Sequence, residues 1–139
     1  MSKLWIVHRH ARRRQALARL TGLPPEAIVA GDQKDDAFGR NEPPRVLLLA
    51  LEGDFESELD FLDRHREHLA NTRRLLLVEA FDQAEARRLT GARTEDLLDA
   101  RTEPRALRSL IRSVLTRRPA EPLPARREKQ HLLARFANW

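Results

Sequence analysis

Short apolar runs alternate with amphipathic segments along the first 118 residues. The runs are rich in leucine and β-branched residues and too short for helices, which predicts buried strands. The predicted strands are 4–7, 27–30, 46–51, 75–78 and 96–99. The predicted helical segments are 9–20, 35–38, 54–69, 83–89 and 104–118. This alternation is typical of an α/β domain with a five-stranded parallel sheet and helices on both faces.

Residues with special backbone preferences mark the ends of several predicted elements. Gly22 is expected to stop the first helix. Thr102 can cap the last helix, and Pro104 suits its first turn because a proline there loses no hydrogen bond. The apolar positions of two helices follow helical spacing. They are Phe55, Leu59, Leu62 and Leu69 in one helix, and Ala106, Leu107, Leu110, Ile111, Val114 and Leu115 in the last.

The chain divides into a domain, 1–118, and an appendage. A proline-rich stretch, 119–125, is expected to be a stiff linker. The segment 126–139 is predicted to be a helix with Leu132 and Phe136 on its apolar face. That face has no obvious partner in the chain. We expect it to lead to a missing output domain or to dock onto a second copy.

Composition excludes several classes of protein. The chain has 139 residues, 41% hydrophobic and 34% charged, which suits one domain of ordinary size. It has no cysteine, which excludes disulfides, thiolate metal sites and cysteine catalysis. The longest apolar run, 46–51, is too short to span a membrane, and the N-terminal run is too short for a signal peptide. A cytoplasmic location is therefore expected.

Charge is unevenly distributed. The net charge is +5, and only three of the 26 basic residues are lysines. Residues 1–20 contain six basic residues and no acid, whereas 52–68 contain seven acids and two arginines. Residues 101–118 contain six arginines and one acid. This pattern predicts basic and acidic faces, which are either solvated helix surfaces or complementary contact surfaces for a second copy or a partner.

The order of elements resembles the receiver domain of bacterial response regulators over residues 3–118. The most specific match is Pro44 and Arg45 followed by the run 46–51, which resembles the third receiver strand. Gly91-Ala92, then Leu97-Leu98 and the segment 102–107, resembles the closing part of a receiver. The resemblance implies a flavodoxin-like sheet with strand order 2-1-3-4-5.

The residues that carry receiver chemistry are all replaced. The resemblance places the Mg²⁺-binding acidic pair, the phosphoacceptor aspartate, the Thr or Ser and the lysine on other residue types. These positions of the degenerate pocket are His8 and Arg9, Ala50, Glu79, and Ala100 or Arg101. Phosphoryl transfer to aspartate needs a carboxylate nucleophile and a cation held by oxygen ligands. The resemblance therefore implies a pseudo-receiver without catalytic residues, metal or cofactor.

Histidines near the predicted strand ends admit two interpretations. His8 and Arg9, with His10, could form an anion pocket, since ligands of open α/β sheets bind at the strand ends. Alternatively, Arg9 pairs with Glu52 or Glu79 inside the degenerate pocket.

His65 and His68 lie three residues apart on the acidic helix, where solvent exposure is expected rather than metal binding. The chain has no P-loop, GxGxxG, HExxH or GxSxG motif, and an enzyme is not expected.

The resemblance also implies a contact surface. In receivers, the fourth helix, fifth strand and fifth helix commonly mediate dimerisation through salt bridges. The interface candidates here are Arg105, Arg108, Arg112, Asp96, Arg87, Leu132 and Phe136. Mixed charges suit a two-fold contact, in which the acids of one subunit meet the bases of the other.

The main hypothesis is a regulatory pseudo-receiver of a bacterial transcription regulator that acts as a homodimer or by partner binding. An AAA+ ATPase is the output domain suggested by the resemblance. The alternative is a basic nucleic-acid-associated protein that uses Arg12–Arg14 and the arginines of 105–118, although the domain alone is not expected to bind nucleic acid at physiological salt. A small enzyme with His8 and Glu79 at its site is a third possibility. The small number of aromatic residues argues against binding of single-stranded nucleic acid.

Overall fold

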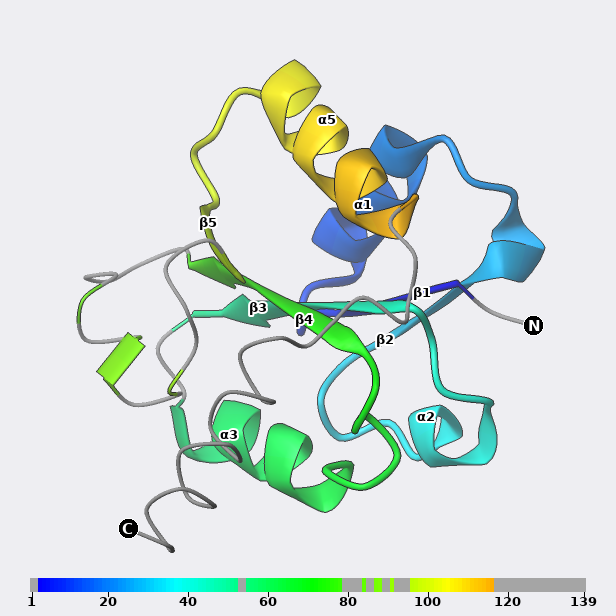
Figure 1. Cartoon of the computed structure of the whole chain (residues 1–139), viewed down its shortest axis with the longest axis vertical. Helices are drawn as coiled ribbons and strands as arrows, with labels where there is room; N and C mark the ends of the chain where they lie inside the picture. The colour runs from blue at the N-terminus through cyan, green and yellow to red at the C-terminus, as the bar shows by residue number, and fades with distance from the viewer. Residues whose placement is uncertain are drawn as a thin grey trace, which may run out of the picture.

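The computed structural model describes residues 3–52, 55–78, 84, 87–88, 91 and 96–116. Its centre is a parallel sheet with strand order β2-β1-β3-β4-β5 (Figure 1). The strands are β1 (Leu4–Val7), β2 (Ile28–Gly31), β3 (Val46–Leu51), β4 (Arg73–Val78) and β5 (Leu97–Asp99). The order 2-1-3-4-5 confirms the predicted α/β fold, and the weakest predicted strand, the fifth, is present.

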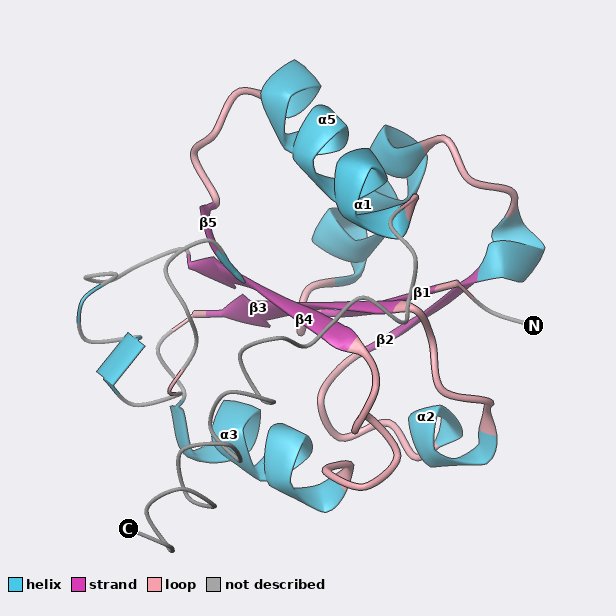
Figure 2. Cartoon of the chain, viewed as in Figure 1, coloured by secondary structure: helices cyan, strands magenta, loops and turns pink. Residues whose placement is uncertain are grey.

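Helices cover both faces of this sheet (Figure 2). The described helices are α1 (Ala11–Thr21), α2 (Ala37–Arg40), α3 (Phe55–Arg64) and α5 (Pro104–Leu115), with a 3₁₀ turn at Pro25–Ala27. Figure 1 shows α1 and α5 together on one face and α2 and α3 on the other. The sheet is therefore the middle of three layers.

Successive strand residues point into two different cores. Trp5, Leu47 and Leu76 belong to the core on the α2–α3 face. Their chain neighbours Leu48 and Leu75 belong to the core on the α1–α5 face. Because side chains alternate along a strand, a strand buried on both faces must be apolar at every position. This explains the continuous apolar runs of the sequence.

The first helix ends where the sequence predicts. Gly22 follows α1 with φ 72°, in the left-handed region, and its N–H donates to the Arg19 carbonyl. Glycine adopts this conformation without the strain that a Cβ would cause. The turn also contacts the last helix, because an Arg112 guanidinium N–H donates to the Thr21 carbonyl at 2.6 Å.

The start and the buried face of α5 differ from the prediction. The N-cap is Glu103, not Thr102, and its carboxylate accepts the N–H of Arg105 at 3.3 Å. Pro104 occupies the first turn as expected. The buried residues are Leu107, Ile111 and Leu115, whereas Leu110 is 45% exposed and Ala106 is also exposed. The apolar stripe contacts the rest of the protein along one edge only.

The third helix is shorter than predicted, and its buried positions differ in part from the predicted ones. It ends at Arg64 instead of about residue 69, and the chain continues in tight turns with bonds such as Arg66 N–H to the Asp63 carbonyl. The buried positions are Glu58, Phe61, His65 and Leu69, while Leu59 and Leu62 are half-buried. The prediction is right for Leu69, which is buried, and for Leu62, which packs against the core, but polar Glu58 and His65 occupy two of the four buried positions.

The expectation that His65 and His68 face solvent is also wrong. His65 is 8% exposed, and its ring lies 4.5 Å from that of Phe61, centroid to centroid. The half-buried His68 ring stacks on Trp5 with centroids 5.6 Å apart, and its Nε2 lies 2.6 Å from the Asn41 carbonyl oxygen. Both imidazoles therefore contact the buried indole of Trp5, His68 by stacking and His65 edge-on.

Several predicted segments lie wholly or largely outside the described residues. Of the predicted helix 83–89 only residues 84, 87 and 88 are described, and the segments 119–125 and 126–139 fall outside. This includes Leu132 and Phe136. Within the described part of the chain, no helix has the length and apolar character needed to cross a membrane.

Candidate functional site

The carboxyl ends of β1 and β3 form the natural ligand edge of this sheet. The chain leaves β1 through α1 on one face and leaves β3 through α3 on the other (Figure 1). Strand order reverses between these two strands, and such a switch point creates a crevice at the strand ends. His8 follows β1 directly, and Glu52 follows β3 directly.

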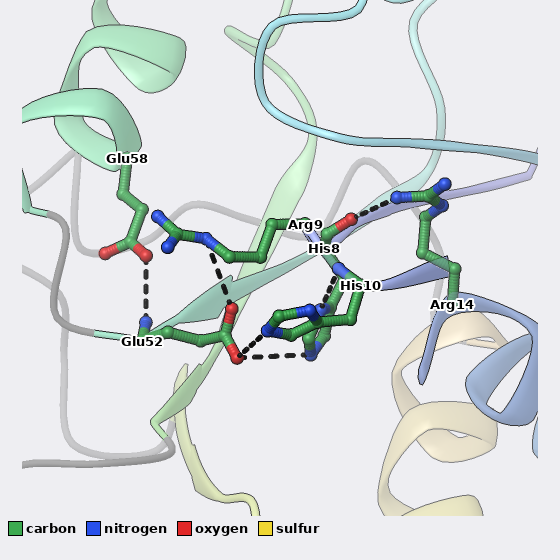
Figure 3. Close-up of polar contacts among 6 residues, drawn as sticks. All are labelled: His8, Arg9, His10, Arg14, Glu52 and Glu58. Carbon is green, nitrogen blue, oxygen red and sulfur yellow. Dashed lines mark hydrogen bonds and ion pairs between the residues drawn. The ribbon is translucent and has the colours of Figure 1, made fainter. Parts of the chain in front are cut away.

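The Glu52 carboxylate is surrounded by three donor groups at this edge (Figure 3). Arg9 Nε lies 3.5 Å from Oε1. His10 Nε2 and His8 Nε2 lie 3.5 and 3.9 Å from Oε2. The His8 side chain is fully buried, and that of Glu52 is only 16% exposed. An internal anion therefore occupies the place where the sequence suggested an external one, and Arg9 pairs with Glu52 as the alternative interpretation proposed.

The ring of His8 is fixed in one tautomer when neutral. Its Nδ1 accepts the backbone N–H of His10 at 3.1 Å and so carries a lone pair. The proton of a neutral imidazole must then lie on Nε2, the nitrogen that faces Glu52. A nitrogen that carries a proton is a hydrogen-bond donor and has no lone pair for a metal ion.

The described residues at this edge do not fit the Mg²⁺ ion of receiver chemistry. Magnesium prefers oxygen ligands, whereas His8 and Arg9 present N–H donors at the end of β1. Glu52 supplies oxygens, but both already face these donors and His10. Among the described residues, no cluster of three histidines, cysteines or acids has the geometry of a metal site.

The helices that follow the two strands hold this arrangement in place. The Arg14 guanidinium, from α1, donates to the His8 carbonyl at 2.6 Å. The buried carboxylate of Glu58, from α3, accepts the backbone N–H of Glu52 at 2.8 Å. Both strand ends are therefore tied to side chains of the helices on opposite faces of the sheet (Figure 3).

Two of the other positions of the degenerate pocket, Ala50 and Ala100, have the small side chain of alanine. Ala50 is buried in β3 opposite Leu77 of β4 and offers only a methyl group. The Ala100 N–H donates to the Val78 carbonyl at 2.9 Å. Glu79 lies outside the described residues.

Arg101 is engaged by a neighbouring acid. Its backbone N–H and its guanidinium both donate to the carboxylate of Asp99. These hydrogen bonds lower the pKa of Asp99 and raise that of Arg101. Both residues are in contact with solvent, so this pair is a local feature of the turn after β5.

The interface candidates have different fates. Arg105, Arg108 and Arg112 are exposed on α5, and Arg87 is exposed as well. Asp96 is already engaged within the domain. Its carboxylate is 13% exposed and lies 2.7 Å from the Arg73 guanidinium, so it ties β5 to the start of β4. Its role in a contact between copies stays a prediction.

Sequence reasoning did not identify two residues that hold the site. Arg14 and Glu58 each lie six residues from the backbone atom that they bind. Neither spacing is a known motif, since both contacts cross from a strand end to the following helix. The one available signal was an acid at a position of α3 that the helical period could place toward the sheet.

Comparisons with known proteins bear on the fold. No family model and no curated protein matches the sequence. Among solved structures, a response regulator from Thermotoga maritima matches with a TM-score of 0.63 and 15% identity, over 84% of this chain and 99% of that chain. A fusion containing the yeast Spc42 trimeric coiled coil matches with a TM-score of 0.62 and 10% identity, over 99% of this chain and 97% of that chain. The chain has a receiver-like, flavodoxin-like α/β fold.

Proposed function

We propose that this chain is a non-catalytic pseudo-receiver domain of a bacterial signal-transduction or transcription regulator. The observation that carries the proposal is the Glu52 cluster with Arg9, His8 and His10 at the strand ends of a receiver-like fold. The similarity to a solved response regulator supports the architecture. The residues at the carboxyl ends of β1 and β3 support the proposed loss of phosphorylation chemistry.

The chemical argument rests on two missing components. A receiver is phosphorylated on a carboxylate, and the corresponding position here, Ala50, has a methyl group. Transfer also needs a divalent cation to offset the charge of the phosphoryl oxygens. The guanidinium of Arg9 repels such a cation and pairs with the nearest carboxylate, Glu52. The domain is therefore proposed to be neither an enzyme nor a target of aspartate phosphorylation.

Regulation then depends on association. We infer a homodimer or a contact with an output domain, such as an AAA+ ATPase in a longer chain. The α5 surface supports this inference. Leu110 lies on this surface and is 45% exposed. Among the described residues, it is the large hydrophobic residue that is exposed. Arg105 and Arg108 lie on the same helix and are exposed. An apolar residue with flanking arginines suits a small protein interface.

Light scattering across a protein concentration series tests the proposal. Each sample is measured with and without Mg²⁺ and beryllofluoride, which mimics a phosphoryl group. We expect a molar mass that rises toward a dimer with concentration and does not respond to the mimic. A mass that changes on addition of the mimic would overturn the loss of phosphorylation chemistry. A monomer at every concentration would overturn the homodimer.

Two variants locate the contact. Leu110→Lys should shift the association to higher concentration, because it places a charge in the apolar contact. The matched control is Glu56→Lys on α3, an exposed position on the opposite face of the sheet. If both variants weaken association equally, α5 is not the contact surface.

A further inference from the structure

Two arginine-rich helices that are far apart in sequence lie together on one face of the sheet. Helix α1 carries four arginines and α5 carries three, and neither helix contains an acid. Both lie on the same face of the sheet (Figure 1). They meet directly, since Arg112 donates to the Thr21 carbonyl at the end of α1. We call this layer the arginine face; it comprises Arg12, Arg13, Arg14, Arg19, Arg105, Arg108 and Arg112.

The charges of four of the seven arginines of this face are uncompensated within the described structure. Arg12, Arg19, Arg105 and Arg108 make no ion pair with any described residue. All four are exposed. The arginines of the opposite layer behave differently. Arg64 and Arg66, for example, pair with acids within the same short stretch of chain.

This arrangement is unfavourable for the fold itself. Arg12–Arg14 lie in the first turn of α1, at the positive end of the helix dipole, where acids are stabilising and bases are not. Arg108 and Arg112 are four residues apart on α5, and like charges at that spacing repel. Each effect is a few tenths of a kcal/mol. Local rules broken together on one surface are expected at sites of function.

We propose that the arginine face binds the phosphate backbone of double-stranded nucleic acid. A polyanion relieves the repulsion among these arginines, and the planar guanidinium matches phosphate geometry with paired hydrogen bonds. Large protein interfaces need several apolar or aromatic anchors, whereas the described part of this surface offers one, Leu110, which suits a small contact. The described Trp5, Phe38 and Phe61 side chains are buried and not available for base stacking, which favours a duplex over a single strand.

The acidic layer on the other side of the sheet determines which face of the domain a duplex would contact. Helix α3 contains Glu56, Glu58, Asp60 and Asp63, with Arg64 as its single base. A duplex is repelled by that layer and attracted by the arginine face. The same acids could attract the arginine face of a second copy. However, Asp60 and Asp63 are already paired with Arg64 and Arg66, which makes this occupant less favourable.

The proposal revises the expectation that the domain alone does not bind nucleic acid. It does not rest on the loss of phosphorylation chemistry, but it shares Arg105 and Arg108 with the proposed α5 contact, so a duplex and a protein partner would compete for this helix. The sequence shows two basic segments, each of which could be a solvated helix face. The structure places them side by side with no acid between them on either helix. Loss of phosphorylation chemistry and the presence of a polyanion surface can each hold or fail alone.

Fluorescence anisotropy with a labelled random-sequence DNA duplex tests the proposal. Titrations are made with the full chain between about 50 and 200 mM salt. If about four phosphates are contacted, the logarithm of the affinity should fall with the logarithm of salt with a slope of roughly −4. Binding that is absent at the lowest salt, or that does not depend on salt, would overturn the proposal.

Two sets of variants with equal net charge separate a defined face from overall charge. The triple variant Arg12→Gln, Arg105→Gln, Arg108→Gln should bind at least about tenfold more weakly, with a slope less steep by about 3. The control triple Arg40→Gln, Arg66→Gln, Arg74→Gln removes the same charge from exposed positions away from this face. It should bind like the parent. Equal losses in both would show that net charge alone drives binding.

A competition experiment distinguishes nucleic acid from an acidic protein. Unlabelled duplex should displace the labelled duplex far more effectively than polyglutamate at the same concentration of negative charge. Equal competition by polyglutamate would overturn the proposal in favour of an acidic protein partner. Thermal unfolding of each variant confirms that the substitutions, all at exposed positions, leave the fold intact.

Discussion

Arg9 and Glu52 form an ion pair, 3.5 Å from Nε to Oε1, across the carboxyl ends of β1 and β3. These strands are neighbours in the sheet although 38 residues separate them in sequence. The pair therefore lies at the edge where open α/β sheets commonly bind their ligands. The Glu52 carboxylate also faces two imidazoles, so this edge contains its own anion.

Removing the charge of Glu52 should destabilise the fold. In Glu52→Gln the buried His8 N–H and the Arg9 guanidinium lose a charged acceptor, while the shape of the side chain is kept. We expect a loss of about 1–3 kcal/mol in the free energy of unfolding, measured with urea. Glu42→Gln, at an exposed position, is the control and should change stability by less than about 0.5 kcal/mol. Equal effects would mean that the Glu52 cluster contributes no stability.

Stability should decrease in mild acid because of His65. Burial, Arg64 and His68 lower the pKa of His65 below 6.5, and Asp60 partly opposes this shift. The unfolded chain then binds the proton more readily than the folded chain. The free energy of unfolding should therefore fall as the pH drops through about 6.5 toward the pKa of His65 in the folded state. Well above pH 6.5, His65 is neutral in both states and this effect should be absent.

The variant His65→Phe isolates this contribution. A phenyl ring can keep the contacts with Phe61 and Trp5 but cannot be protonated. Urea unfolding from about pH 8 to about pH 5 should show a shallower loss of stability for the variant than for the parent. The other histidines are present in both proteins, so the difference reports His65. Parallel pH profiles would contradict the assignment.

The pair of Arg73 and Asp96 should act within the fold and not between copies. Asp96→Asn should lower the free energy of unfolding by about 1 kcal/mol or more, because the carboxylate is largely buried and accepts from the guanidinium. Asp63→Asn, which weakens the exposed pair with Arg66, should change it by less than about 0.5 kcal/mol. A change in the dimerisation constant without a change in stability would show instead that Asp96 acts in the contact between copies.

The N-cap of α5 distinguishes two adjacent residues. Glu103→Ala removes the carboxylate that accepts the Arg105 N–H and should destabilise the fold by about 0.5–1 kcal/mol. Thr102→Ala should have a smaller effect, because no hydrogen bond of its hydroxyl caps the helix. Thermal unfolding of the two variants compares them directly. A larger effect of Thr102→Ala would support the cap that the sequence suggested.

The strands and their order could be predicted because they depend on local patterns and on the resemblance. The run Val46–Leu51 has no polar residue, and a strand buried on both faces requires this. Gly22 marked the end of α1 because few other residues adopt a positive φ without strain. Signals of this kind lie within a few residues of the feature that they specify.

Two buried residues, Glu58 in α3 and His65 just after it, could not be predicted, because their burial depends on distant partners. Glu58 and His65 are polar, so the period of the apolar residues pointed to a different side of the helix. They are buried because of partners elsewhere: Glu58 accepts the N–H of Glu52, and His65 packs on Trp5 and Phe61. Tertiary contacts override hydrophobic pattern where a polar side chain finds its partner across the fold.

The candidate site was predictable in part. The resemblance placed His8 and Arg9 at the strand end, and Glu52 was one of two acids expected to pair with Arg9. The shared carboxylate with His10 and the fixed tautomer of His8 depend on the exact turn after β1, which no sequence rule specifies. The arginine face likewise required the packing of α1 against α5.

The most direct test of the pseudo-receiver proposal is the intact mass of the chain after incubation with acetyl phosphate and Mg²⁺. A phosphorylatable receiver domain, treated in parallel, shows that the donor is active. We predict no phosphoryl adduct, because in the proposed correspondence Ala50 replaces the phosphoacceptor and Arg9 pairs with Glu52 where the metal would bind. An adduct that maps to an acid at the carboxyl edge of the sheet, such as Glu52, would contradict the account.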